Sequence, residues 1–73
     1  MDYTNKKITL GDGITYLVIN QVNYNNSIYL YIVNKDNEDD TKFVEVKNDE
    51  LLSIDPELFD TTIFPLFMEE FRK

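Results

Sequence analysis

The sequence contains no cysteine, histidine or tryptophan, and it has only two glycines and two prolines. Without cysteine, no disulfide or thiolate-bound metal can stabilise the fold, so stability must come from apolar packing. Imidazole acid–base catalysis, thiol nucleophiles and zinc sites built from these ligands are excluded as well. These absences favour a non-enzymatic protein with no catalytic residues, no cofactor and no metal site.

Targeting and membrane patterns are also missing from the sequence. Residues 1–13 contain no apolar stretch typical of a signal peptide. No other run approaches the about 18 apolar residues that a membrane span requires. We therefore expect a cytoplasmic protein that does not bind membranes.

Charge of one sign dominates the second half of the chain. Residues 1–35 carry two acids and three lysines, a net charge of +1, whereas residues 36–73 carry twelve acids and four basic residues, a net charge of −8. No basic patch is available to neutralise phosphates, which disfavours direct binding to nucleic acid. We expect a protein partner with a basic surface.

The remaining composition is that of a small folded domain. A length of 73 residues predicts a single domain over 1–73. Hydrophobic residues make up 42% of the chain and include five Phe and five Tyr, which is enough apolar area to argue against intrinsic disorder.

Alternating apolar residues and short Gly- or Asn-rich breaks predict a series of strands. In the second strand, Ile14, Tyr16, Val18, Val22 and Tyr24 should share one face. The third stretch, "IYLYIV", is apolar on both faces, as in a central strand that is covered on both sides. The predicted strands are residues 6–10, 14–24, 28–33 and 41–47, with 51–54 as a short edge strand.

The C-terminal residues 56–71 predict a helix. Asp55 suits the N-cap and Pro56 the first helical position. From there an apolar residue recurs every four positions, whereas Pro65 should kink the helix or divide it in two. We predict an α+β fold, an antiparallel four- to five-stranded β-meander packed against this one kinked helix. The helix should pack on the face formed by Ile28, Leu30 and Ile32.

The order of these elements resembles the YrzB-type domain, a family of small acidic proteins of unknown function from low-GC Gram-positive bacteria and their mobile elements. The resemblance covers roughly residues 8–67 and is carried by "ITLGDG", "SIYLYIV", an acidic turn, "KFVEV" and "LLSI". It implies a β-meander followed by a helix. It implies no activity and no catalytic residue.

The stretch "KDNEDDTK", residues 35–42, holds four carboxylates in five positions. An EF-hand loop that starts at Asp36 needs Asp or Asn third, Gly sixth and Glu twelfth, where this chain has Glu38, Thr41 and Lys47. The remaining interpretations are a solvated hairpin turn and part of an acidic surface that mimics nucleic acid. The acids available to such a mimic are Asp36, Glu38, Asp39, Asp40, Glu45, Asp49, Glu50, Asp55, Glu57, Asp60, Glu69 and Glu70.

Two sets of residues are therefore candidates for binding a partner. One is aromatic and lies in the helix, which carries more large apolar side chains than one buried stripe needs. The other is the acidic stretch. We expect a protein-binding regulatory or inhibitory module that also forms a homodimer; the alternative is a phage-type acidic mimic that inhibits a nucleic-acid-binding enzyme. The candidate residues in the helix are Phe64, Phe67, Met68 and Phe71. The candidate residues in the acidic stretch are Asp36, Glu38, Asp39 and Asp40.

Overall fold

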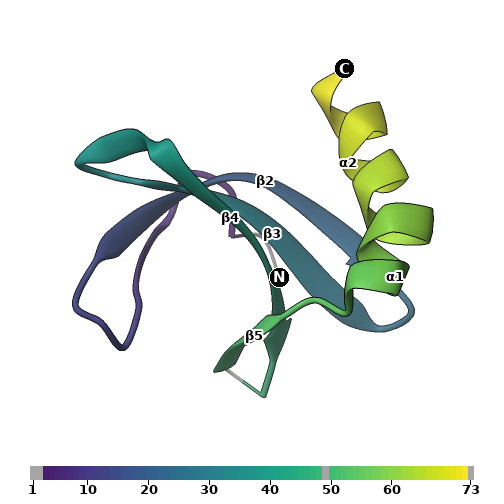
Figure 1. Cartoon of the computed structure of the whole chain (residues 1–73), viewed down its shortest axis with the longest axis horizontal. Helices are drawn as coiled ribbons and strands as arrows, with labels where there is room; N and C mark the ends of the chain where they lie inside the picture. Colours follow the sequence, from purple (N-terminus) through teal and green to yellow (C-terminus); the bar gives the residue numbers. More distant parts are fainter. Residues whose placement is uncertain (1–2, 49, 73) are drawn as a thin grey trace.

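The computed structural model describes residues 3–48 and 50–72, and this part of the chain forms a five-stranded antiparallel sheet followed by one helical segment (Figure 1). The strands lie in the sheet in the order in which they occur in the chain, so the predicted β-meander and its fifth strand are confirmed. Asp49 of the acidic set lies outside the described residues. The strands are β1 (Lys7–Thr9), β2 (Thr15–Tyr24), β3 (Ser27–Asn34), β4 (Asn37–Lys47) and β5 (Glu50–Ser53).

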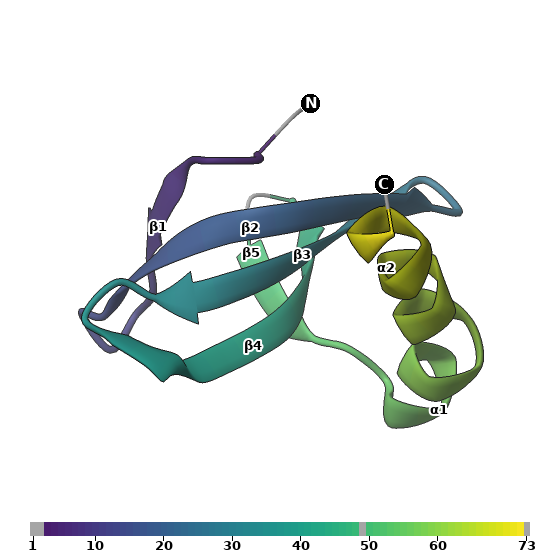
Figure 2. The ribbon, with the colours of Figure 1, turned by 90° about the horizontal axis from the view of Figure 1, so that it is seen from above.

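The predicted turn between β2 and β3 is confirmed, and asparagine makes it. Asn25 and Asn26 have φ angles of 52° and 65°. Positive φ at both central residues is what a two-residue hairpin turn needs to match the twist of its strands, and Asn tolerates it better than most residues. This turn places the end of β2 and the start of β3 close to the helical segment (Figure 2).

A bulge in β2 changes which side of the sheet its residues face. The pairing with β3 shifts by one residue between Val18 and Asn20, which leaves Ile19 as the extra residue. One extra residue reverses the in-and-out alternation of every side chain beyond it. Val18 and Val22 therefore belong to different cores. The prediction that Val22 and Tyr24 share the face of Val18 is wrong.

The first core lies on the inner side of the curled sheet. Figure 2 shows the curl of the sheet. Half-buried Ile8 and Leu10 from the β1 end and Leu51 from β5 pack against the same buried cluster. The two edge strands thus cover much of the face that they share with Leu30. The buried members of this core are Tyr16, Val18, Leu30, Ile32 and Val44.

The second core lies between the sheet and the helical segment, and it is built on the opposite face of β3. It consists of Val22, Tyr29, Ile63 and Phe67. The prediction that the helix packs on the Leu30 face is therefore wrong. The curl already covers the Leu30 face with the edge strands, which leaves the tyrosine face to be buried by the helix.

The helical segment runs through α1 (Pro56–Leu58), a π-helical turn η1 (Phe59–Ile63) and α2 (Phe64–Phe71). As predicted, the Asp55 side chain accepts the Glu57 backbone N–H, and Pro56 occupies the first turn. The predicted kink before Pro65 is confirmed as the π-helical turn, in which the Phe64 N–H bonds to the Phe59 carbonyl. The wider turn moves aside the carbonyl with which the proline ring would otherwise clash.

Candidate functional site

The helical candidates divide between the outside and the inside of the molecule. Phe64, Met68 and Phe71 are 42%, 39% and 42% exposed, and their spacing of four and three residues places them on one stripe of α2. Phe67 is fully buried between α2 and the sheet. Its inclusion among the partner-binding residues is therefore wrong, because its side chain has no surface left to offer a partner.

The exposed stripe continues into a row of rings that crosses from the helix to the sheet. The ring of Phe71 meets that of Tyr31 edge-on, with centroids 5.7 Å apart, and Tyr31 stacks on Phe43 at 4.8 Å. Phe43 contacts Phe59 at 4.9 Å, and Phe59 contacts Phe64 at 5.6 Å. We call this surface the aromatic face; it consists of Tyr31, Phe43, Phe59, Phe64, Met68 and Phe71.

A hollow of about 470 Å³ opens at one end of the aromatic face, where β4, β5 and α1 meet. Phe43 and Phe59 line it together with Ile54 and Pro56, so much of its wall is apolar. Its charged lining residues are Lys42 and Asp60. The hollow extends the aromatic face by a shallow recess that an apolar side chain of a partner can fill.

Several carboxylates lie on the same strand and helical segment as the aromatic face. Glu57, Asp60 and Glu69 are exposed on the helical segment. Glu45 lies two residues beyond Phe43 on β4 and faces the same side of the sheet, because both residues pair with tyrosines of β3. Arg72 lies 4.0 Å from Glu69 in an exposed ion pair. We call Glu45, Glu57, Asp60 and Glu69 the acidic rim, because they place negative charge on the elements that carry the aromatic face.

The acidic turn lies at the far end of the sheet from α2, as both views of the molecule show (Figures 1 and 2). Asp36, Glu38 and Asp39 are exposed there. Most of the stretch belongs to a strand and not to the predicted turn, because β4 begins at Asn37 and not at residue 41. The exposed members of the two candidate sets thus lie on two separate surfaces.

Asp40 differs from the other acids of this stretch. Its Oδ2 accepts hydrogen bonds from the Tyr16 hydroxyl at 3.0 Å and from Asn34 Nδ2 at 3.2 Å, and its Oδ1 lies 3.6 Å from Lys42 Nζ. The bonds from Asn34 and Tyr16 lower the pKa of Asp40. Burial, followed by the contact with Asp40, raises the pKa of Tyr16. Asp40 is thus held within the fold, and neither the spacing nor the composition of the sequence indicated its contact with Tyr16.

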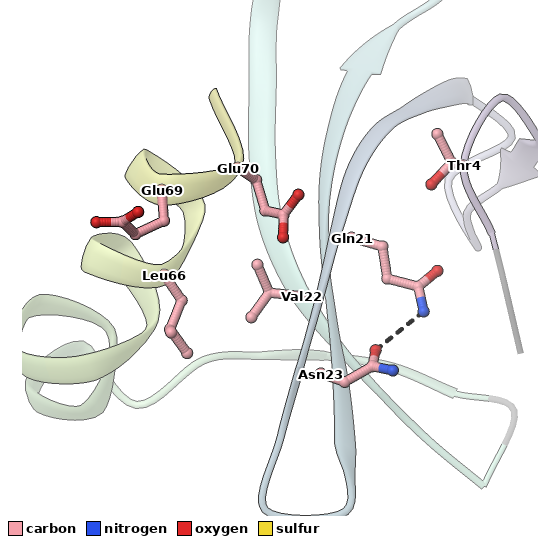
Figure 3. A pocket seen from close by; sticks show the side chains of 7 residues that line it. All are labelled: Thr4, Gln21, Val22, Asn23, Leu66, Glu69 and Glu70. Atoms are coloured by element: carbon pink, nitrogen blue, oxygen red, sulfur yellow. Dashed lines mark hydrogen bonds between the residues drawn. The ribbon is translucent and has the colours of Figure 1, made fainter. Parts of the chain in front are cut away.

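A third feature is a cleft of about 510 Å³ between α2 and β2 (Figure 3). Leu66 and Val22 face each other at its base, and the carboxylate of Glu69 points away from β2. Glu69 and Glu70 are the only titratable side chains among the described residues that line it.

Within residues 3–48 and 50–72, no three acidic side chains come together in a way that could hold a metal ion. No helix in this part of the chain is long and apolar enough to cross a membrane. Both findings concern the described residues alone.

Comparison of the chain with protein-family models, with curated proteins and with solved structures found no match. The resemblance to the YrzB-type domain therefore stays a prediction. The aromatic face and its acidic rim are the features of the molecule that bear on its function.

Proposed function

We propose that this protein is a non-enzymatic regulatory or inhibitory module that binds another protein through the aromatic face. One observation carries the proposal: Phe64, Met68 and Phe71 all remain about two-fifths exposed on one stripe of a helix that already buries Phe67. Single exposed apolar residues are ordinary, but a contiguous patch with polar surroundings is typical of an interaction site. Aromatic side chains also dominate the binding energy of many protein interfaces.

The polar cluster around Asp40 has the features of a structural group rather than of a general acid or base. A general acid or base works best with a pKa near the operating pH. The pKa of Asp40 is lowered and the pKa of Tyr16 is raised, so both move away from neutrality. Their mutual hydrogen bond also occupies the Tyr16 hydroxyl, which suits a structural role.

The alternative, an acidic mimic of nucleic acid, is less favoured by the arrangement of the carboxylates. A mimic needs its acids along one rigid face, as phosphates lie along a strand. Asp36, Glu38 and Asp39 lie at the end of the sheet opposite to α2, whereas Glu57, Asp60 and Glu69 belong to the helical segment.

Affinity capture from a lysate of the producing cell, at low and at high salt, tests the proposal. An aromatic interface should retain its partner at high salt, whereas an acidic mimic should lose it. The double variant Phe64→Gln/Met68→Gln should lose the partner, and the triple variant Asp36→Asn/Glu38→Gln/Asp39→Asn should keep it. The opposite result would show that the acidic turn is the binding surface.

A further inference from the structure

We infer that the occupant of the aromatic face is a basic amphipathic helix of a partner protein. This inference rests on the proposed function and adds the chemistry of the partner. Three features lead to it: the backbone around the face, the spacing of its exposed side chains and the charge of its rim.

The exposed anchors belong to a helix, whose backbone groups bond within the helix itself. A partner that adds a strand needs a row of unpaired backbone groups of extended chain beside the anchors, and a helix does not present such a row. The contact must therefore be made between side chains. A helix presents a row of apolar side chains while satisfying its own backbone groups, which makes it the suitable element.

The anchors also have the dimensions of a helix contact. Seven residues separate Phe64 from Phe71, which corresponds to about 10 Å along the helix axis. The sheet residues Tyr31 and Phe43 continue the surface to the side of this ridge, and the hollow of about 470 Å³ lies at its N-terminal end. Two turns of a partner helix with apolar residues at spacings of three and four match such a surface.

The rim determines the charge of the partner. Residues 55–72 carry five acids and one base, and this base, Arg72, lies beside Glu69. Glu45 adds a further carboxylate on the sheet side, and Lys42 at the hollow is already within 3.6 Å of Asp40. Lysine or arginine on the flanks of the partner helix would complement this rim, and a partner with acidic flanks would be repelled.

A second copy of this chain suits the rim less well. In a two-fold dimer through the aromatic face, the acidic rims of the two helices would meet each other. The chain as a whole has a net charge of −7, which adds to this repulsion. The homodimer expected from the sequence is thus the competing occupant, and its formation through this face would overturn the inference.

Three synthetic probe peptides of about 15 residues, a length at which isolated helices become stable enough to observe, test the inference. The first has leucine at helical spacing and lysine at the remaining positions. The second replaces every lysine by glutamate, and the third has the composition of the first in scrambled order. Each is titrated into the full chain, and the backbone amide NMR shifts give the affinity and the location of binding.

We expect the first peptide to bind, with shift changes concentrated in residues 59–71 and at Tyr31 and Phe43, while the second and third bind at least about tenfold more weakly. Phe64→Gln/Met68→Gln should weaken binding of the first peptide about tenfold or more. The matched control Ile14→Gln/Ile19→Gln removes a similar exposed apolar area, since these residues are 37% and 42% exposed, and should leave the affinity unchanged.

The contrary outcomes separate this inference from the proposed function. If the glutamate peptide binds the aromatic face as tightly as the lysine peptide, the inference of a basic partner is wrong. The aromatic face would still be a docking surface in that case. If the scrambled peptide binds as tightly as the first peptide, or if the shift changes are confined to residues 36–39, the inference of a helical partner is wrong. Sedimentation equilibrium that shows a dimer broken by Phe64→Gln/Met68→Gln would assign the face to a second copy. If none of the three peptides binds, the inference is also wrong.

Discussion

The hydroxyl of Tyr16 on β2 donates a hydrogen bond of 3.0 Å to Oδ2 of Asp40 on β4. Asn34, at the end of β3, donates to the same oxygen. One carboxylate therefore joins three neighbouring strands at the end of the sheet that lies away from the helix. Lys42 lies with its Nζ 5.7 Å from the centre of the Tyr16 ring and completes the cluster.

Stability at acid pH should depend on Asp40. Its folded pKa is lowered below the ordinary value of 3.8, so its contribution is complete above that value and is lost as the pH falls through the folded pKa. We expect Asp40→Asn to unfold at a lower temperature than the wild type at neutral pH. The difference should narrow as the pH falls below the ordinary value and through the folded pKa of Asp40. Thermal unfolding followed by circular dichroism measures it, and a difference that does not change with pH would contradict this role.

Adjacent residues of α2 should respond very differently to truncation. Phe67→Ala removes a fully buried ring and should lower the free energy of unfolding by about 3–5 kcal/mol. Met68→Ala changes an exposed side chain and should alter it by no more than about 0.5 kcal/mol. Urea denaturation of both variants measures the difference. Comparable losses would mean that Met68 is part of the core and not of the binding surface.

Leu30 should stabilise the core on the side of the sheet away from the helix. Leu30→Ala should cost about 2–5 kcal/mol, because the side chain is completely buried. The control Leu52→Ala, at a side chain that is 39% exposed, should cost far less. The amide shifts of α2 should change less in Leu30→Ala than in Phe67→Ala. If the amide shifts of α2 change more in Leu30→Ala than in Phe67→Ala, Leu30 packs against the helix and this assignment of the two faces is wrong.

The bulge at Ile19 should be essential to the fold even though its side chain is not. Deleting Ile19 restores strict alternation along β2 and turns either Val18 or Val22 out of its core. The deletion variant should therefore fail to fold cooperatively, as judged by the loss of dispersed amide NMR signals. Ile19→Ser keeps the extra residue and exposes no core side chain, so it should fold normally. A well-folded deletion variant would show that the register can adjust.

The strands and the helix were predictable because their signals are local. Alternation predicts a strand, the pair Asn25 and Asn26 predicts a turn, and Asp55 followed by Pro56 predicts a helix start. The side of β3 that receives the helix was not predictable. Both of its faces are apolar, so only the curl of the sheet, which arises from contacts between distant strands, decides which face the helix covers.

The bulge was hidden for a related reason. One additional residue in a run of β-branched and aromatic residues leaves no mark in composition, and Ile19 looks like any other strand residue. The candidate site was predictable in part: the surplus of aromatics pointed to Phe64, Met68 and Phe71. Spacing alone could not separate them from Phe67, because residues three and four apart occupy neighbouring positions on a helix. Tyr31 and Phe43 were missed, since they join the site only through the reversed packing.

The central claim is that another protein contacts the aromatic face, and site-specific photo-crosslinking in the producing cell tests it most directly. A photoreactive amino acid is placed at Met68 in one variant and at the similarly exposed Ile19 in another. The account predicts one discrete crosslinked product from position 68, containing a protein with a basic helical segment, and none from position 19. Crosslinking that is absent at both positions, or equal at both, would contradict it.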